Sequence, residues 1–425
     1  MYLNSAARIV GDRLRQPHRM ETYWAFRKTT NQIARLTRHS NRRFARVIAK
    51  DLADFLLGLT PVAGEVEFRA KAAADWLLRA QAKTGGGGVS LGFFPCDDGP
   101  AWFSPYPETT GYIITSLLKY ASRSHNDVVR QRALQMATWE IDVQMSSGAV
   151  QGGPFVPDAQ QSPCAFNTGM VLDGWCSAFE TTRESWYAVA ARRAADYLVA
   201  DLTDDSYFRT NGQFVRSDRI KTYNCLCAWS MHRLGELLHE PRYKLHAVRV
   251  IEAALRQQRS NGWFDHNCLT RPETPLLHTI AYTLQGILEV GLLSRREDFV
   301  EAVRSGVASL LSRMSPNGFL PGRYDSNWEP ASFSSCLTGS AQLAVVCYRL
   351  FDHTRVETYR LAANRLVNFL KPLQRLNPDC PDISGALPGS FPIFGEYMTA
   401  GYPNWATKYL LDALMLQADF GTQTS

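Results

Sequence analysis

The sequence repeats one pattern six times, and this periodicity restricts the fold more than any other feature. Each copy has a glycine followed by bulky apolar residues and, 12 to 20 residues later, the head of an apolar helix. The heads are 58, 56, 55, 59 and 66 residues apart, a period that suits a helical hairpin with a long loop. The glycines are Gly92, Gly153, Gly212, Gly262, Gly318 and Gly385, and the helix heads fall near Thr110, Thr168, Asn224, Thr279, Thr338 and Asn404. Six such hairpins are able to close into a ring, with their long loops gathered over one mouth.

Each repeat contains two helices whose surfaces differ. The helix before the glycine is amphipathic: between 187 and 198, apolar residues recur every three or four positions with charged residues between them. The helix after the glycine, as at 112–118 and 340–346, is apolar nearly all round, which is typical of a helix buried on both sides. The sequence therefore predicts an all-α protein, an (α/α)6 toroid with amphipathic helices outside and buried helices inside.

Composition and charge divide the chain into two unequal parts. With 425 residues, of which 45% are hydrophobic and 11% aromatic, the chain can bury a large core. We expect one toroid domain over residues 61–425 and a basic helical extension over residues 1–60, because residues 1–50 hold twelve Lys or Arg and two acidic residues, a local balance of +10. A solvated helix face is the leading interpretation of this charge. Contact with an acidic polymer or an anionic lipid surface is the alternative, whereas nothing resembles a nucleic-acid-reading module.

Cysteine usage and hydropathy indicate the cellular setting. Nine cysteines, an odd number scattered along the chain, favour reduced thiols over a disulfide framework. No stretch approaches the roughly 20 apolar residues of a membrane span, and the N-terminus lacks the apolar core of a secretion signal. We therefore expect a cytoplasmic protein without a transmembrane segment. Cys225 and Cys227 have no second pair at zinc-like spacing, so neither a metal nor an organic cofactor is expected.

The loops that lead into the apolar helices are rich in aromatic and ionisable residues, and loops on a rigid scaffold often carry function. This mixture suits a sugar, since its C–H faces stack on aromatic rings while its hydroxyls form hydrogen bonds. For any single residue, packing or helix capping is the more common role. The predicted substrate-binding residues are Trp102, Tyr223, Trp263, Arg271, Arg323, Tyr324, Trp328, Tyr397 and Trp405. The arginines suit an acidic oligosaccharide or polysaccharide.

Three reactions and one binding role fit these side chains. Hydrolysis needs two carboxyl groups, for which Glu108 is the candidate acid and Asp158 or Asp325 the candidate partner. A uronate lyase or C5-epimerase instead needs a base and a cation that neutralises the substrate carboxylate. Candidates for that chemistry are Tyr106, Tyr324 and His266 with Arg271 and Arg323. A toroid that only binds a polysaccharide, as an assembly scaffold, is the fourth interpretation.

From about residue 65 onward the chain resembles the α,α-toroid proteins. This group includes six-hairpin glycosidases, polysaccharide lyases, glucuronyl C5-epimerases, terpenoid cyclases and protein prenyltransferases. The runs at 106–112 (YPETTGY) and 402–414 (YPNWATKYLLDAL) resemble the first and last inner helices of toroid proteins from bacterial exopolysaccharide gene clusters, and 102–107 (WFSPYP) resembles a run in the epimerase domain. The resemblance implies the toroid fold and a role in exopolysaccharide biosynthesis.

The isoprenoid branch of this group is the least favoured. The cyclase motif D-x-D-D is incomplete at 95–98 (PCDD), the D-x-C of prenyltransferases is replaced by DHNC at 265–268, and no Cys is followed by His. Because hydrolysis is the most frequent reaction in the carbohydrate branch, the sequence predicts a glycoside hydrolase acting on an oligosaccharide or exopolysaccharide. A uronate lyase or C5-epimerase is the alternative.

Overall fold

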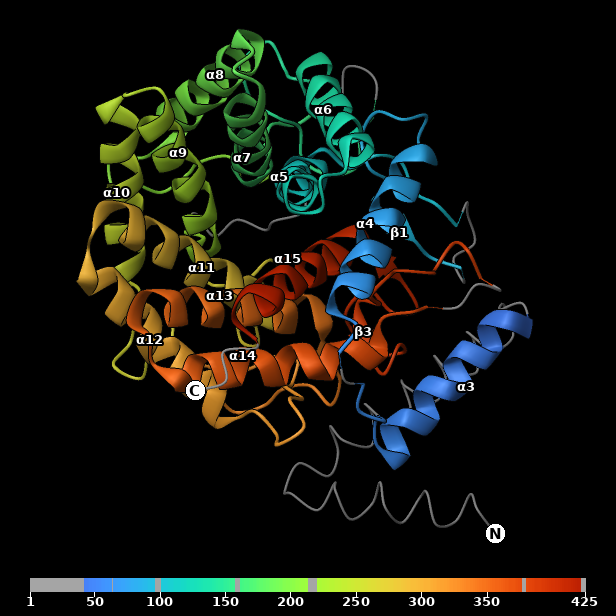
Figure 1. Ribbon diagram of the computed structural model, residues 1–425. Coiled ribbons are helices and arrows are strands. Elements are labelled where there is room, and N and C mark those ends of the chain that lie inside the picture. The colour runs from blue at the N-terminus through green and yellow to red at the C-terminus, as the bar shows by residue number, and fades with distance from the viewer. Residues whose placement is uncertain are drawn as a thin grey trace.

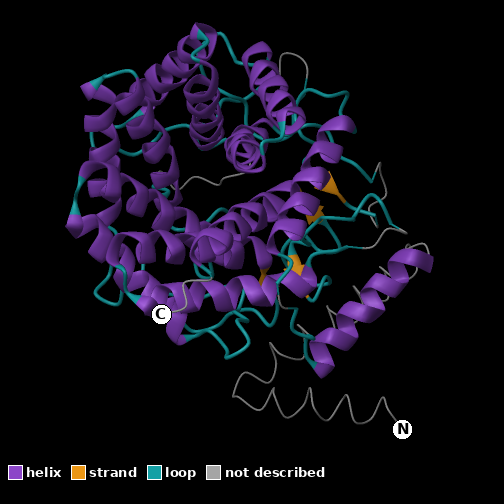
Figure 2. Ribbon diagram, viewed as in Figure 1, coloured by secondary structure: helices purple, strands orange, loops and turns teal. Residues whose placement is uncertain are grey.

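Two concentric rings of helices form most of the part of the chain that the structure describes (Figures 1 and 2). The computed structural model describes residues 42–62, 64–95, 101–156, 161–212, 220–376 and 380–421. The outer ring consists of α4 (Val66–Ala82), α6 (Asp127–Asp142), α8 (Ser185–Asp201), α10 (Pro241–Leu255), α12 (Glu297–Ser312) and α14 (Glu357–Leu370). The inner ring consists of α5 (Pro107–Ser124), α7 (Ala165–Thr182), α9 (Cys225–Leu237), α11 (Leu277–Ser294), α13 (Leu337–Thr354) and α15 (Asn404–Phe420).

The ring closes by contacts between its first and last units. Each inner helix packs against the next, from α5 through α7, α9, α11 and α13 to α15, which contacts both α5 and α4. Two short antiparallel pairs fasten the loops: β1 (Gly92–Phe93) pairs with β4 (Tyr402–Pro403), and β2 (Ser335–Cys336) pairs with β3 (Ser390–Phe391). The predicted all-α (α/α)6 toroid is confirmed. The described residues also form two 3-10 turns, η1 (Thr222–Asn224) and η2 (Lys371–Leu373).

Small residues let the inner helices approach one another closely. A Cβ added to Gly111 of α5 would lie 2.5 Å from the Cα of Val171 in α7, and one added to Gly286 of α11 would lie 2.2 Å from the carbonyl carbon of Cys225 in α9. These overlaps with backbone atoms cannot be relieved by a side-chain rotation. The apolar helices of the sequence therefore form the inner ring because they are both hydrophobic all round and notched with glycine.

The turn after the outer helix is the same in the second, third, fourth and fifth units. Gly262 in the fourth unit and Gly318 in the fifth are glycines of the predicted repeat. Each donates its N–H to the carbonyl oxygen three residues earlier. The same bond is made by Gly148 in the second unit and by Ser206 in the third. The equivalent positions are thus Gly148 and Ser206, five residues before Gly153 and six before Gly212. All four residues have a positive φ, so the turn geometry is the conserved element of the repeat, and in the third unit a serine adopts it.

Replacing Gly385 by alanine should open the ring seam and lower the free energy of unfolding by about 2 kcal/mol. This residue has a φ of +99°, and a Cβ there would lie 2.0 Å from the carbonyl oxygen of Ala72 in α4. Gly58 is a matched control, because it has the same φ of +99° but nothing within 4 Å of an added Cβ. Urea unfolding of both variants measures the difference. Equal losses would mean that backbone strain, and not contact with α4, accounts for the effect.

A further helix, α3 (Arg42–Leu57), lies outside the ring beside the loop that holds β3 (Figure 1). Its Ile48 is 2% exposed, and Phe55 makes edge-on ring contacts with Phe333 and Phe391. The fully buried Asp51 of α3 pairs with Arg375 and accepts the N–H of Ile393. The last part of the predicted N-terminal extension is therefore docked on the sixth unit, and the domain boundary at residue 60 stays a prediction.

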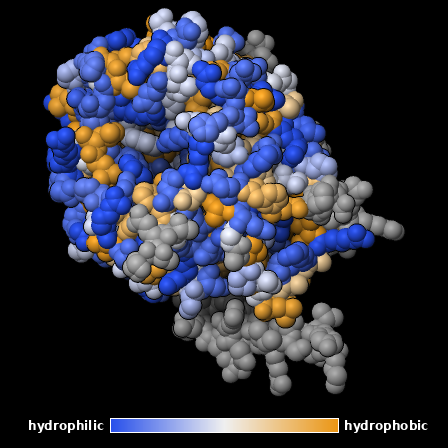
Figure 3. Space-filling view, viewed as in Figure 1, coloured by the Kyte–Doolittle hydropathy of each residue, from blue (hydrophilic) through white to orange (hydrophobic). Residues whose placement is uncertain are grey.

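The described surface and helices agree with the hydropathy of the sequence. On the face shown in Figure 3, hydrophilic and hydrophobic side chains are interspersed. Among the helices that the structure describes, none is long and apolar enough to cross a membrane.

Candidate functional site

The first turns of the inner helices bring a group of polar and aromatic side chains together at one end of the ring. Pro107 begins α5, so Tyr106 is its N-cap residue and Glu108 lies in its first turn. The Tyr106 hydroxyl donates a hydrogen bond of 2.6 Å to Oε2 of Glu108. Two of the predicted catalytic residues therefore form a bonded pair at the head of an inner helix.

Glu108 lies among six tyrosines that come from five parts of the chain. Burial raises the pKa of each tyrosine well above its ordinary value, and the nearby negative charge of Glu108 raises it further. All six hydroxyls therefore stay protonated at neutral pH, and that of Tyr106 is donated to Glu108. The six are Tyr106, Tyr112, Tyr223, Tyr282, Tyr397 and Tyr409, and we call them the tyrosine cluster.

The protonation of Glu108 is set by its surroundings. Burial raises its pKa to about 7, although the hydrogen bond from Tyr106 acts in the opposite direction. A carboxyl group with a pKa near 7 is a proton donor matched to neutral conditions. The residue as a whole is partly exposed.

His278 is the second titratable side chain in contact with the tyrosine cluster. Its ring centroid lies 4.1 Å from that of Tyr282 and 6.0 Å from that of Tyr397, and its Nδ1 lies 3.1 Å from Oε1 of Gln342. Burial lowers the pKa of His278 to about 3. The imidazole is therefore neutral at physiological pH and is suited to orienting a neighbour, whereas a cationic role is excluded.

Lys408 places a cation beneath the same rings. Its Nζ lies 3.8 Å from the ring centroid of Tyr409 and 4.8 Å from that of Tyr112, and it forms a 2.8 Å ion pair with Asp412. Contacts between an ammonium group and aromatic faces are favourable when both are desolvated. Lys408 therefore stabilises the tyrosine cluster through its contacts with these two rings.

Trp405 and Tyr397 close the aromatic wall on the side of the sixth unit. The indole Nε1 of Trp405 donates to the hydroxyl of Tyr397 at 2.7 Å, and its ring meets Tyr106 edge-on at 6.2 Å. Tyr223, on η1, meets Phe166 edge-on at 5.3 Å. Of the predicted substrate-binding residues, Tyr223, Tyr397 and Trp405 thus lie together with Tyr106 and Glu108.

Two arginines and one carboxylate form a second group on the rim. Oε2 of Glu396 lies 3.1 Å from a guanidinium nitrogen of Arg271 and 3.4 Å from Nε of Arg323. Burial lowers the pKa of Arg323, and the adjacent charge of Arg271 contributes in the same direction. The group carries a net charge of +1, and Glu396 directly precedes Tyr397, so an excess of positive charge lies next to the tyrosine cluster.

Other predicted residues have structural roles. Trp263, Tyr324 and Trp328 are at most 4% exposed and pack on each other, with ring centroids 4.9 Å apart for the two tryptophans. Oδ1 of Asp325 accepts the N–H groups of Asn327 and Glu329 and so closes a turn. These four side chains have the packing and capping roles that the sequence analysis gave as the more common alternative.

The remaining candidates lie away from Glu108 or outside the described residues. Trp102 is partly buried, with its ring 5.6 Å from that of Trp76, and its Nε1 donates to Asp382. His266 is exposed in a loop with a φ of +58°. Asp158 lies outside the residues that the structure describes.

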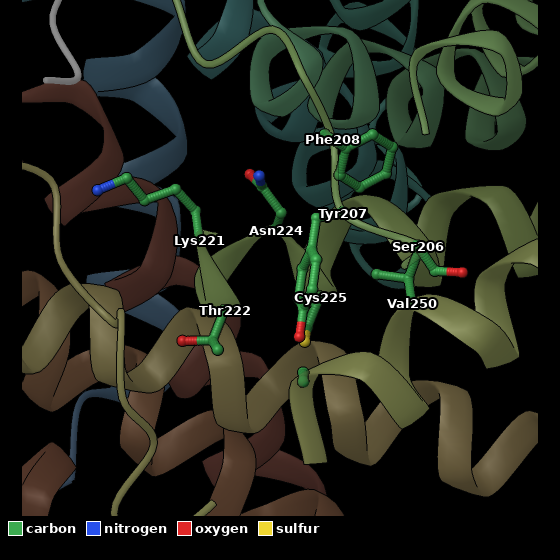
Figure 4. Close-up of a pocket in the computed structure, with 9 residues that line it drawn as sticks. Ser206, Tyr207, Phe208, Lys221, Thr222, Asn224, Cys225 and Val250 are labelled. Carbon is green, nitrogen blue, oxygen red and sulfur yellow. The ribbon is translucent and has the colours of Figure 1, made fainter. Parts of the chain in front are cut away.

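A small void behind η1 is the nearest described cavity to Tyr223. Its volume is about 10 Å³, which is room for one water molecule and too little for a sugar. The lining residues shown in Figure 4 come from the loop before η1, from η1 itself and from α9 and α10. Asn224, on this void, has an Oδ1 atom without a hydrogen-bond partner among the described residues. The void therefore suits a structural water that supports Tyr223 from behind.

Comparisons with known proteins reveal similarity in structure and not in sequence. No protein-family model and no curated protein matches the sequence. The chain superposes on an unsaturated glucuronyl hydrolase specific for heparin with a TM-score of 0.67 and 15% identity, over 84% of this chain and 98% of that one. A cellobiose 2-epimerase from Bacillus thermoamylovorans gives a TM-score of 0.63 with 9% identity, over 82% of this chain and 98% of the epimerase. A D-mannose isomerase gives a TM-score of 0.63 with 12% identity, over 82% of this chain and 97% of the isomerase.

The protein is an α/α toroid. The toroid gathers Glu108, the tyrosine cluster and His278 at the N-terminal ends of its inner helices, where the long loops meet. Among the residues described, no group of three His, Cys, Asp or Glu side chains is placed to hold a metal ion.

Sequence reasoning missed several members of the toroid's site. The predicted site did not include Lys408, Gln342, His278 or three of the six tyrosines, Tyr112, Tyr282 and Tyr409. A signal was present, since Gln342 and Lys408 are polar residues in otherwise apolar inner helices. A buried polar residue in such a helix needs a partner, and the partners lie on other helices of the ring.

Proposed function

We propose that the toroid is a carbohydrate-active enzyme that hydrolyses a glycosidic bond with Glu108 as general acid. The observation that carries this proposal is the Glu108 carboxyl, whose pKa is raised to about 7 by burial. The carboxyl also accepts a 2.6 Å hydrogen bond from Tyr106. Protonation of a leaving oxygen requires such a carboxylic acid near neutral pH. The partial exposure of Glu108 supports access for a sugar oxygen.

The surroundings of Glu108 support a sugar as the substrate. Tyr106 and Tyr397 are the partly exposed members of the tyrosine cluster and offer apolar ring faces to the C–H side of a sugar ring. The other four tyrosines are at most 4% exposed and pack around them. The superposed toroids include a glucuronyl hydrolase and a cellobiose epimerase, whose names refer to sugars. Fold alone does not carry function to this chain, so the proposal rests on the cluster.

A second carboxylate would act as base or nucleophile. We retain Asp158 as the partner predicted from the sequence and add Glu396, which is exposed on the rim beside Tyr397. Asp325 is the weaker choice, because its Oδ1 closes a local turn and, among the described residues, no contact joins its side chain to the tyrosine cluster. The separation of the two carboxyl groups would decide between inversion and retention of configuration.

An acidic substrate is the second part of the proposal. The excess positive charge of Arg271 and Arg323 over Glu396 favours a uronate or another anionic sugar, since arginine pairs well with carboxylates. This same observation favours a second candidate function, a uronate lyase or C5-epimerase. In that reaction the arginines would neutralise the substrate carboxylate, and Tyr106 would pass its hydroxyl proton to the ionised Glu108 carboxylate and then take the C5 hydrogen as a proton. Glu108 would give its proton to the leaving oxygen in a lyase, or to C5 in an epimerase. We also propose an exopolysaccharide as the substrate and a cytoplasmic location for the protein.

Incubation with neutral and uronate-containing bacterial polysaccharides distinguishes these reactions. We expect new reducing ends without ultraviolet absorbance, which identify hydrolysis. Absorbance from an unsaturated uronate would identify a lyase, and deuterium uptake at C5 without cleavage would identify an epimerase. Binding without any of these three signals would contradict the catalytic proposal and leave the scaffold interpretation.

A further inference from the structure

A shallow groove of about 620 Å³ lies on the flank of the ring, between α6 and the loop that follows α4. These two helices are neighbours in the structure (Figure 1). Its volume is within the usual range of a small-ligand site, about 300–1,000 Å³. Its lining includes Gly85, Gly86, Gln131, Gln135, Trp139 and Asp142.

The run Gly85–Gly88 shapes this groove in two ways. A Cβ on Gly87 or Gly88 would lie 2.5 or 2.3 Å from ring carbons of Trp139, so the bare backbone of these glycines packs directly on the indole. Gly85 and Gly86 have nothing within 4 Å of an added Cβ. Two glycines therefore fix the indole, while the other two leave the space beside it open.

Trp139 is held rigidly but is not fully covered. Phe155 meets its ring edge-on at 5.6 Å, on top of the contacts from the glycine backbone. The side chain nevertheless stays partly exposed. A preorganised, partly exposed aromatic ring provides apolar contact for a ligand at low entropic cost.

Polar groups line the groove next to the indole. Gln131, Gln135 and Asp142 lie at helical spacing on α6, and all three are exposed. In the described part of the chain, the side chains of these residues have no hydrogen bond or ion pair. Two amides and one carboxylate supply both donors and acceptors, and none of the nine lining residues is a cation. This lining suits a ligand that is rich in hydroxyl groups and carries no negative charge.

The end of the groove at Asp142 lies toward the end of the ring that holds Glu108. The glycine run leads directly to Val89, whose N–H donates to the hydroxyl of Thr110, two residues beyond Glu108. Asp142 is the last residue of α6, where the outer helices reach this end of the ring. A polymer bound at Glu108 and longer than the site would meet the groove as it crosses the rim.

We propose that this groove is a second carbohydrate-binding site, which holds a neutral stretch of the polysaccharide chain. The inference rests on the proposed function for the identity of the polymer, but binding in the groove requires no catalysis. The indole supplies the sugar-facing apolar surface, and Gln131, Gln135 and Asp142 supply the hydrogen bonds.

The test compares variants of the full-length protein that all carry Glu108→Gln, so that no substrate is consumed. Isothermal titration with cello-, malto- and mannohexaose measures the dissociation constant. Gln131→Ala/Gln135→Ala/Asp142→Ala should weaken binding at least about 10-fold, because several net hydrogen bonds are lost. Arg249→Ala is the matched control, since Arg249 is the exposed residue at the position of Gln135 in the α10 unit, and it should change binding less than about 2-fold. The substituted side chains are exposed, and circular dichroism verifies that each variant is folded.

Two results would overturn the groove proposal. One is unchanged hexasaccharide affinity in the triple variant, and the other is the absence of binding by every neutral hexasaccharide at millimolar concentration. A uronate hexasaccharide that depends equally on the three side chains would contradict the neutral class of ligand. None of these results bears on the reaction at Glu108, which product analysis of the native protein decides, so failure of the groove and failure of the proposed function are distinguishable.

Discussion

Glu108→Gln is expected to lower kcat on the polysaccharide substrate about 1,000-fold, because glutamine keeps the shape of the side chain but cannot donate a carboxylic proton. The dissociation constant of the substrate should change less than about 3-fold, since the interaction removed matters mainly in the transition state. Steady-state rates and titration of unreacted substrate measure the two quantities. A variant with kcat near that of the native protein would remove Glu108 from the proposed mechanism.

The pH profile of the same reaction is a second measure of Glu108. Burial raises its pKa to about 7, and the protonated form is the active acid, so activity should fall as pH rises through about 7. Tyr106 provides the matched variant, because its hydrogen bond lowers the pKa of Glu108. Tyr106→Phe should therefore move the alkaline limb to higher pH. A limb that moves to lower pH, or stays in place, would show that another group controls it.

Asp51→Ala is expected to lower the free energy of unfolding by about 3–5 kcal/mol. Asp51 is fully buried, and its removal leaves the guanidinium of Arg375, whose side chain is 8% exposed, without its carboxylate inside the protein. The substitution also removes the acceptor for the N–H of Ile393, in the loop that leads to Tyr397. Denaturant unfolding measures the loss, and activity should fall with it because that loop carries part of the aromatic wall.

Asp54→Ala is the matched control on the same helix. Asp54 pairs with Lys50, which is largely exposed, and exposed pairs of this kind contribute about 1 kcal/mol or less. The double variant Asp51→Leu/Arg375→Met should recover part of the lost stability, because it leaves no buried charge unpaired. Losses of similar size in Asp51→Ala and Asp54→Ala would mean that α3 contributes nothing specific to the sixth unit.

Much of the fold was predictable because it is encoded within single hairpins. The hydrophobic period identified both helix types, and the predicted heads lie within about one helical turn of the observed first residues of the inner helices, such as Pro107, Ala165 and Asn404. The glycine assignment differs from the structure in the second and third units because the repeated feature is a turn hydrogen bond, which Gly148 and Ser206 make and which does not require glycine. Residue identity is an incomplete guide to backbone conformation.

The candidate site was only partly predictable. Tyr106, Glu108, Tyr397 and Trp405 were found because they adjoin helix heads in the sequence. Trp263, Tyr324 and Trp328 are also aromatic residues in the loops that precede inner helices, yet they are packed against one another. Whether a loop aromatic faces a ligand or a neighbouring hairpin depends on contacts between units, and these contacts leave no signature in the local sequence.

The sequence by itself determined the all-helical hairpin, its sixfold repetition and the order of outer and inner helices, because amphipathicity and glycine placement act over a few residues. Only the tertiary structure decided which side chains meet. Ring closure brings Gly385 against Ala72 and Trp405 beside Tyr106, residues about 300 positions apart. The same closure surrounds Glu108 with tyrosines from distant helices, and this burial is what raises its pKa to about 7. Desolvation is a property of the assembled ring, so the chemistry proposed for Glu108 exists only in the folded protein.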